Sequence, residues 1–198
     1  MRNFVYFSNS AATSGKALSG GNVNLMKAGR MDIVIHVIIN AFFISHDIRD
    51  DLKLHLIFNG PPDPPRHIEI NITPEMSLSK KDIGTFLKKV LYKYREGGRH
   101  EVFPGCFIEK KSFLKVIDDF LEEGKKIFVM DRKGASLRNV EISEDSVFVI
   151  GDHDGLPKKE LKRLKNLEGI HRVSVGPKMY FASQVATIIN NELDIRGL

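Results

Sequence analysis

The sequence predicts an α/β fold in which a mostly parallel sheet is flanked by helices. Short apolar runs without alternation, at residues 127–130 and 147–150, are typical of strands that helices cover on both faces. Amphipathic segments, such as residues 113–121, alternate with such runs in the second half of the chain. With 198 residues, of which 42% are hydrophobic, the chain can bury a core of its own, so a single domain over residues 1–198 is expected.

The first part of the chain mixes strand and helix patterns. The apolar run 4–7 predicts a buried strand, and the small and polar residues 11–21 predict a mobile loop after it. Residues 32–45 are apolar around the whole circumference of a helix, which predicts a helix that is sandwiched or lies in an interface. Alternating apolar residues predict strands at 52–58 and 68–72.

The connection between these two strands is rich in proline. Residues 59–66 hold four of the chain's eight prolines. Because proline fixes φ and lacks an N–H donor, this segment is predicted to be stiff and to stay outside the sheet ladder. A helix is predicted next, over residues 79–94, and Gly97 and Gly98 end it.

The remaining elements alternate between helix and strand. The amphipathic stripe at 113–121 predicts a helix, with Gly124 at its C′ position. The later predictions are, in order, strands at 127–130 and 147–150, a helix from Pro157 through Leu167, a strand containing Val173 and Val175, and a final helix at 181–193.

The charge distribution favours a polyanionic partner. Thirty Lys and Arg against 25 Asp and Glu give a net charge of +5, and the excess is concentrated in residues 80–99 and 158–172. Two basic clusters of this kind suit a nucleic acid, whose phosphates supply most of the attraction. The alternative is that both clusters are solvated helix faces.

No membrane protein or secreted protein is indicated. No apolar stretch reaches the roughly 18 residues that a membrane span requires, and the first residues lack a secretory pattern. The single cysteine, Cys106, is consistent with a reducing, cytoplasmic setting. We expect Cys106 to be a small buried hydrophobic residue rather than a nucleophile.

Three predicted strands end in segments suited to a ligand. These are residues 131–134, which begin with Asp131, residues 151–157, which begin with Gly151, and residues 176–183, which begin with Gly176. Ligands of open parallel sheets bind beyond the carboxyl ends of the strands, so these segments are expected to meet. The two glycines would let the backbone approach a ligand closely. Ordinary turns between strand and helix are the alternative.

Other chemistries lack their patterns. Gly15-Lys16 resembles the end of a phosphate-binding loop, but Ser10 stands where that motif requires glycine. Contiguous residues on a loop, such as 152–154, rarely converge on one ion, so no metal is expected. The Gly-x-Ser-x-Gly pattern of serine hydrolases does not occur.

The run 147–157, with Gly151-Asp152-His153-Asp154-Gly155 inside it, and the later Ser174-Val175-Gly176-Pro177 closely resemble the SPOUT class of RNA methyltransferases. Within that class the whole chain resembles the archaeal tRNA (pseudouridine-54) N1-methyltransferases. Residues 24–30, which include Lys27-Ala28-Gly29, resemble the Lys-Ala-Gly stretch of ribosome-biogenesis pseudouridine methyltransferases.

The resemblance implies a fold, a cofactor and an assembly. It implies a deep C-terminal trefoil knot, S-adenosylmethionine bound inside the knot, and a homodimer for which the helix at 32–45 and the last helix are candidate interfaces. The implied cofactor-binding residues are Val129, Met130, Asp131, Gly151, Asp152, Ser174, Val175, Gly176, Pro177, Lys178, Met179 and Ser183.

The resemblance also implies a reaction, methyl transfer to N1 of pseudouridine 54 in the T loop of tRNA. N1–H is weakly acidic and must lose its proton, so a carboxylate that acts as base or orienter would help. We expect this group to be Asp63, on the proline-rich segment, with Asp131 and Asp152 as rivals. Arg66 and Arg30 would grip phosphate or steady negative charge on the base. A plain turn residue is the alternative for Asp63.

Two alternative functions remain at this point. One keeps the chemistry but acts on a pseudouridine of ribosomal RNA. The other is a non-catalytic RNA-binding or assembly module of the same fold. Affinity for S-adenosylmethionine separates the module from the enzymes, and the identity of the substrate separates the two enzymes.

Overall fold

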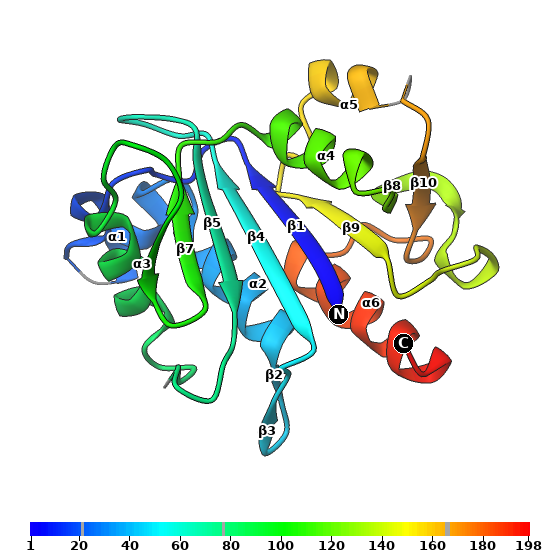
Figure 1. The fold of residues 1–198 in the computed structure, drawn as a ribbon, viewed down its shortest axis with the longest axis horizontal. Helices are drawn as coiled ribbons and strands as arrows, with labels where there is room; N and C mark the ends of the chain where they lie inside the picture. The colour runs from blue at the N-terminus through cyan, green and yellow to red at the C-terminus, as the bar shows by residue number, and fades with distance from the viewer. Residues whose placement is uncertain (21, 77, 165–166) are drawn as a thin grey trace.

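The computed structural model describes residues 1–20, 22–76, 78–164 and 167–198. Its strands are β1 (Arg2–Ser8), β2 (Phe43–Ile44), β3 (Asp47–Ile48), β4 (Leu52–Phe58), β5 (Arg66–Asn71), β6 (His100–Phe103), β7 (Cys106–Glu109), β8 (Lys126–Ser136), β9 (Ser146–Gly151) and β10 (Ile170–Ser174). All except the small β2–β3 hairpin form one sheet, in the order β10-β8-β9-β1-β4-β5-β7-β6 (Figure 1).

The sheet has a parallel and an antiparallel part. From β10 to β4 every neighbouring pair is parallel. Strands β5, β7 and β6 continue the sheet with antiparallel pairs. The predicted mostly parallel sheet is therefore confirmed, and the carboxyl ends of β8, β9, β1 and β4 lie at one edge.

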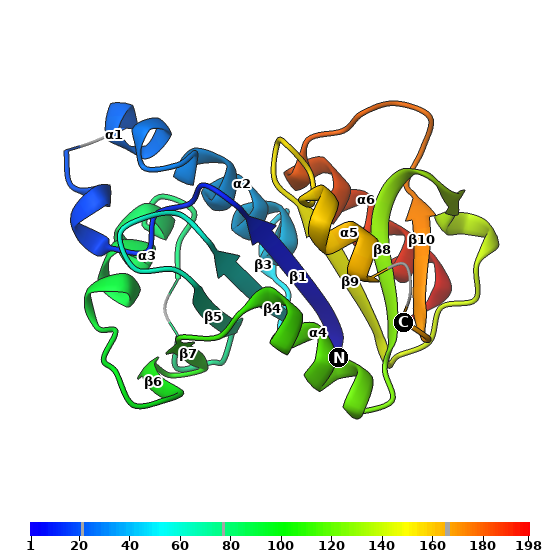
Figure 2. The ribbon, with the colours of Figure 1, turned by 90° about the horizontal axis from the view of Figure 1, so that it is seen from above.

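Helices cover both faces of this sheet. The α-helices are α1 (Asn22–Lys27), α2 (Met31–Phe42), α3 (Ile83–Tyr92), α4 (Phe113–Glu122), α5 (Lys158–Leu164) and α6 (Ala182–Arg196), with short 3₁₀ turns η1 (Gly15–Leu18) and η2 (Leu137–Asn139). Apolar residues of α2, α3 and α6 pack on one face, and those of α4 and α5 pack on the other (Figure 2). The predicted flanking helices are thus confirmed.

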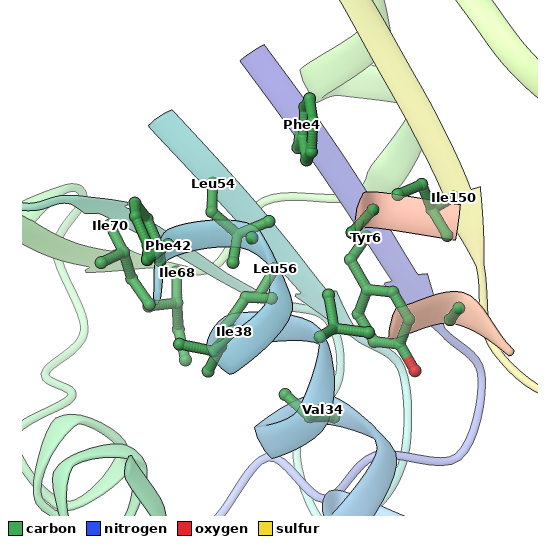
Figure 3. Close-up of a cluster of buried hydrophobic side chains, with 14 of the residues drawn as sticks. Phe4, Tyr6, Val34, Ile38, Phe42, Leu54, Leu56, Ile68, Ile70 and Ile150 are labelled. Carbon is green, nitrogen blue, oxygen red and sulfur yellow. The ribbon is translucent and has the colours of Figure 1, made fainter. Parts of the chain in front are cut away.

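Strand β1 lies in the middle of the core. Its alternate side chains point to opposite faces: Phe4 and Tyr6 join the cluster under α2 and α6, and Val5 and Phe7 join the cluster under α4. Figure 3 shows Phe4 and Tyr6 on the same side as Val34 and the other buried residues of α2. This burial on both faces explains why residues 4–7 form an unbroken apolar run.

Helix α2 packs on the sheet and, along one side, against α6, which covers the same face of the sheet. Asn190 of α6 donates a hydrogen bond to the carbonyl of Ala41 at 2.9 Å, and Thr187 donates to the side chain of Asn40 at 3.0 Å. This arrangement does not sandwich α2, because His36 is exposed and Ile33, Ile35 and Ile39 are half-buried; the alternative expectation, a helix that lies in an interface, stays a prediction. The predicted end of α2 is wrong, because the helix stops at Phe42 and the next two residues pair with β3.

The segment predicted to be a mobile loop is ordered over much of its length. Ala11 and Ala12 are buried, and residues 15–18 form the 3₁₀ turn η1. Thr13 donates its backbone N–H to the carbonyl of Pro61 at 3.0 Å. Gly21, at the end of the predicted loop, lies outside the described residues.

Other boundaries differ from the predictions. Helix α3 is shorter than residues 79–94, α6 begins after Phe181, and Val175 lies just beyond β10. Helix α5 ends at Leu164; residues 165 and 166, within its predicted length, lie outside the described residues. The β6–β7 hairpin was not predicted. Cys106 in β7 is fully buried, which confirms its expected role as a small hydrophobic residue. Within the described ranges, no helix is long and apolar enough to cross a membrane.

Candidate functional site

A cavity of about 610 Å³ lies among the three segments predicted to bind a ligand. Strand β8 contributes residues that leave the ladder: Val129 pairs with Arg172 of β10, and the next pair joins Ala135 to Val173. The ladder is irregular at this point, and of the intervening residues Met130, Asp131, Arg132 and Lys133 line the cavity. The segments after β9 and β10 complete it, as the position of the strand ends predicts.

Nine of the twelve residues implied to bind the cofactor line this cavity. They are Met130, Asp131, Gly151, Asp152, Ser174, Val175, Gly176, Lys178 and Met179. The other three do not line it. Val129 is buried in the core beneath α4, Pro177 is exposed, and Ser183 lies on α6 between two residues, Ala182 and Val185, that do line it.

Apolar residues complete the lining of the cavity. Leu156, Tyr180 and Ala182 belong to the predicted segments, whereas Leu161 of α5 and Val185 of α6 were missed by sequence reasoning. The three-residue spacing from Ala182 is the signal that could have found Val185, because it places both residues on one helix face.

Gly151 is needed for a reason that differs from the predicted one. A Cβ atom on this residue would lie 2.6 Å from the carbonyl carbon of Gly155 and 2.7 Å from the backbone nitrogen of Leu156. The chain's own loop therefore packs against Gly151. The glycine allows the loop to fold back over the end of β9, and this fold forms one wall of the cavity.

Asp152 ties the loop after β9 to the end of β1. Its buried carboxylate accepts hydrogen bonds from Ser8 Oγ at 3.0 Å, from the backbone N–H of Asn9 at 2.9 Å, and from the backbone N–H of Asp154 at 3.0 Å. A carboxylate with these three donors serves the structure, which weakens its case as the base. The rival Asp131 is ion-paired with Arg172 across the cavity wall.

Arg30 is held by a turn that packs on the segment after β1. Gly29 has a φ of +74°, and a Cβ there would lie 1.6 Å from the carbonyl oxygen of Ser10, so only glycine fits. Arg30 then pairs with Asp32, Nε to Oδ1 at 3.0 Å and Nη2 to Oδ2 at 2.9 Å. This pairing lowers the pKa of Asp32. The Lys-Ala-Gly stretch thus has a physical basis in this contact.

Asp63 is held between two cations. Arg66 Nη2 donates to its carboxylate at 2.9 Å, and Lys110 Nζ donates to the other oxygen. The hydrogen bond from Lys110, and next the one from Arg66, lower the pKa of Asp63. The backbone N–H of Asp63 donates to Thr13 Oγ1 at 2.9 Å, so the proline-rich segment is anchored to the chain that follows β1.

Arg66 does not fit its predicted contact with RNA. Its side chain is only 2% exposed, and its guanidinium carbon lies 3.2 Å from the centre of the Tyr94 ring. Among the described residues, its Nε and Nη1 have no hydrogen-bond partner. A guanidinium buried in this way cannot grip phosphate, so we correct its role to that of holding Asp63.

The three predicted catalytic residues do not line the cofactor cavity. Asp63, Arg66 and Arg30 are not among its lining residues. Arg30 is nevertheless tied to the cavity wall: Ser10 Oγ donates to the carbonyl of the preceding Gly29 at 3.1 Å, and the backbone N–H of the neighbouring Asn9 donates to Asp152 at 2.9 Å. The structure therefore brings Arg30 toward Asp152, and gathers Asp63 and Arg66 in a separate group with Lys110.

One group in the described part of the chain has the ligand types and closeness for a metal ion. The ligand atoms of Asp152, His153 and Asp154 lie within 4.8 Å of one another. Asp152 already accepts the hydrogen bonds from Ser8 and Asn9, and His153 Nε2 lies 3.4 Å from Asp154. These contacts give the group a structural role in the loop, and the expectation of no metal stays a prediction.

Comparisons with known proteins agree with the resemblance. A family model described as "Putative SAM-dependent RNA methyltransferase" matches residues 1–198. The chain is 32% identical to the tRNA (pseudouridine(54)-N(1))-methyltransferase of Methanocaldococcus jannaschii, over 98% of this chain and 97% of that protein. It is 33% identical to a "Putative pseudouridine methyltransferase" of Alcanivorax borkumensis, over the whole of both chains.

A solved structure shows the same fold. Nep1 of Archaeoglobus fulgidus, crystallised with S-adenosylhomocysteine, superposes with a TM-score of 0.64 at 16% identity and covers 100% of this chain and 99% of its own. With the family match over the full length and relatives above 30% identity, the chain belongs to the S-adenosylmethionine-dependent RNA methyltransferase family that this model describes.

Proposed function

We propose that this protein transfers the methyl group of S-adenosylmethionine to N1 of pseudouridine 54 in the T loop of tRNA. The observation that carries the proposal is the 610 Å³ cavity, in which nine residues implied by the resemblance meet at the strand ends. Relatives named for this activity align over nearly the whole chain, in Methanocaldococcus jannaschii and in Methanococcoides burtonii.

The cavity fits S-adenosylmethionine in size and chemistry. Its volume lies within the range of about 300–1,000 Å³ that is typical of small-molecule sites. Leu156, Leu161 and Val185 offer apolar surface for an adenine ring, and Asp154 and Lys178 offer opposite charges for an amino-acid end. When bound, S-adenosylmethionine supplies an electrophilic methyl group on a positively charged sulfonium. Loss of the methyl group converts the sulfonium into a neutral thioether, which is the leaving group.

The chain has to position the base and accept the N1 proton. Because Lys110 and Arg66 lower its pKa, Asp63 is ionised at neutral pH, and its half-exposed carboxylate can accept a hydrogen bond from N1–H. A low pKa makes a weak base, so we assign Asp63 to orienting N1–H, with water as the final proton acceptor. Holding the base in line with the methyl group can contribute several kcal/mol to the lowering of the barrier.

Arg66 and Arg30 take different roles in this proposal. Arg66 is a positioning residue, because it is buried under Tyr94 and contacts Asp63. Arg30 is half-exposed, and the turn before it is bonded to Ser10, next to the Asn9 that binds Asp152 of the cavity, so it can stabilise negative charge that develops on the base. The target base must be unstacked from its loop to reach this position.

The assembly is part of the proposal. We propose a homodimer, supported by Met179 and Phe181, which are 80% and 77% exposed beside the cavity and offer apolar surface that a second subunit would cover. We also propose that residues 1–198 act as one domain in the cytoplasm and that the chain from β10 to α6 forms the trefoil knot.

The direct test is methyl transfer to tRNA that carries pseudouridine at position 54. Nucleosides of the treated tRNA, separated and identified by mass spectrometry, should include N1-methylpseudouridine, and tRNA with uridine at that position should stay unmodified. Absence of the product, although S-adenosylmethionine binds, would exclude the proposed substrate.

A matched pair of variants tests the role of Asp63. Asp63→Asn should lower turnover about 100-fold, at the low end of what a group handling the proton contributes, and leave the affinity for S-adenosylmethionine unchanged. Asp118→Asn, on exposed α4, should change neither quantity. Unchanged turnover of Asp63→Asn would remove this residue from the mechanism.

A different pseudouridine is the second candidate. The relative from Alcanivorax borkumensis is named without a modified position. It is 33% identical to this chain, and the tRNA enzyme of Methanocaldococcus jannaschii is 32% identical. Ribosomal RNA fragments that contain pseudouridine belong in the same assay. Calorimetry with S-adenosylmethionine tests the non-catalytic module, because such a module would bind RNA without the cofactor.

A further inference from the structure

A second cavity lies on the α2 side of the sheet. It has a volume of about 620 Å³, similar to that of the cofactor cavity, and it is lined by residues of η1, α1, α2 and α3 together with the segment before α3. These elements lie next to one another in both views (Figures 1 and 2). We call this cavity the lysine groove, because Lys80, Lys81 and Lys88 line it.

The lysine groove has an excess of positive charge. Among the described residues, none of its three lysines has an ion-pair partner within 4 Å. One acidic residue, Asp32, lines the groove, and the bidentate contact with Arg30 neutralises it. The charges available to an incoming ligand are therefore those of the lysines.

Two other members of the predicted basic cluster at 80–99, Lys93 and Arg99, already have partners. Lys93 donates to the carbonyl of Val102 at 2.9 Å and lies over the Phe103 ring. Arg99 pairs with Glu69 and lies over the Phe107 ring. Lys89, next to Lys88 on α3, is exposed but does not line the groove. The structure thus separates three lysines from the rest of the cluster.

The lysine groove leads toward the methyl-transfer site. Asp32 lines the groove and is paired with Arg30. Gly29, next to Arg30, accepts a hydrogen bond from Ser10 Oγ at 3.1 Å, and the neighbouring Asn9 donates its backbone N–H at 2.9 Å to Asp152, which lines the cofactor cavity. A strand lying in the groove would therefore continue past Arg30 to the edge of the cofactor cavity.

We propose that the lysine groove binds the sugar-phosphate backbone of the RNA strand that flanks the target nucleotide, an inference that rests on the proposed function. Unpaired lysines bind phosphates as point charges. The aliphatic residues Leu25 and Ile35 suit ribose, and among the described lining residues His36 is the one ring on which a base could stack. Phosphate contacts carry no sequence information and stacking tolerates every base, so the contact is independent of sequence and holds the strand while the base is presented to the methyl group.

The test compares lysine variants in binding a fluorescently labelled tRNA transcript, which contains no pseudouridine. Anisotropy titrations between 50 and 200 mM KCl give the affinity and its dependence on salt. The triple variant Lys80→Gln, Lys81→Gln, Lys88→Gln should bind more than about tenfold more weakly at 100 mM KCl. Its slope of log affinity against log salt should be smaller by roughly 2, because each lost phosphate contact removes about 0.7–0.9.

Lys88→Gln and Lys89→Gln form the matched pair, because they remove the same charge from neighbouring positions of one helix. Lys88→Gln should lower both affinity and slope, and Lys89→Gln should change neither. Wild-type binding by the triple variant, or equal losses in the paired variants, would overturn the proposal. Circular dichroism and calorimetry with S-adenosylmethionine check that the triple variant is folded and binds the cofactor.

Methylation kinetics separate this proposal from the proposed function. With tRNA that carries pseudouridine 54, the triple variant should show a raised KM for tRNA and an unchanged kcat, because the groove does not touch the reacting atoms. A loss of kcat would place the lysines in the reaction itself and contradict the groove. If the wild-type protein does not methylate this tRNA, the proposed function fails, and the binding titrations still decide the groove.

Discussion

Replacing Gly151 with alanine should damage the cofactor cavity without removing any side chain from it. The added Cβ would lie 2.6 Å from the carbonyl carbon of Gly155, 2.7 Å from the nitrogen of Leu156 and 2.8 Å from the Cα of Gly155. Ordinary contact begins at 3.4 Å, so the loop has to move by 3.4 minus 2.6, or about 0.8 Å. All three contacts are backbone atoms, and no side-chain rotation can relieve them.

The energy of this displacement sets the size of the effect. Forcing one extra carbon into a packed site costs about 1–3 kcal/mol. The loop from Asp152 to Leu156 lines the cavity, so a shift of this loop acts on the bound state. If the cost falls on the binding-competent conformation, the dissociation constant for S-adenosylmethionine rises about 5- to 150-fold, at 1.4 kcal/mol for each factor of ten.

Calorimetric titration with S-adenosylmethionine measures this change, and two other glycines provide the controls. Gly176→Ala would place its Cβ 3.1 Å from the Tyr180 ring, a side chain that can rotate, so its effect should be smaller. In Gly155→Ala the added Cβ has no atom within 4 Å, but a φ of +74° costs an alanine about 1–2 kcal/mol of backbone strain. An unchanged affinity in Gly151→Ala, or an equal loss in Gly176→Ala, would refute the reasoning.

Three further predictions concern stability and positioning. Arg2 is buried and donates to Asp194 at 2.6 Å and to the carbonyl of Leu198 at 2.7 Å, so Arg2→Met should lower the free energy of unfolding by about 2–3 kcal/mol in urea titrations. Tyr94→Leu should lower kcat with unchanged affinity for S-adenosylmethionine, because Arg66 loses its aromatic support, whereas Tyr94→Phe should behave as wild type. His55 is fully buried, and burial holds its pKa well below 6.5, so the unfolded chain binds its proton first and stability falls as the pH drops below about 6.5. His55→Leu should flatten the pH dependence of unfolding by up to about 1.4 kcal/mol per pH unit, and an unchanged slope would contradict this assignment.

The parallel part of the sheet could be predicted from sequence because its strands are buried on both faces. Runs such as 127–130 and 147–150 contain no polar position, and helices on both sides are the usual reason. The β6–β7 hairpin could not be predicted in this way. Its two strands have four residues each and carry His100, Glu101 and Glu109, so their apolar alternation is too short to indicate a strand.

The part of the candidate site that lies at the carboxyl ends of the parallel strands could be predicted from the sequence. The rule that ligands lie beyond the carboxyl ends of parallel strands found the three segments around Asp131, Gly151 and Gly176. The burial of Arg66 could not be predicted, since an arginine beside a proline-rich loop is usually exposed. Its burial depends on Tyr94, which follows α3 in the sequence, whereas Arg66 precedes it. No sequence pattern indicates that these two residues are in contact.

The segment that follows β1 connects the parts of the site. Asp152 is bound to Ser8 and Asn9, and the turn before Arg30 packs on Ser10. The loop that carries Asp63 is bound to Thr13. Residues 8–13 therefore fix the cofactor loop, the arginine and the carboxylate relative to one another, although these groups are far apart in the sequence. Methyl transfer depends on holding the base in line with the methyl group, and a shared backbone support of this kind provides that alignment before the RNA arrives.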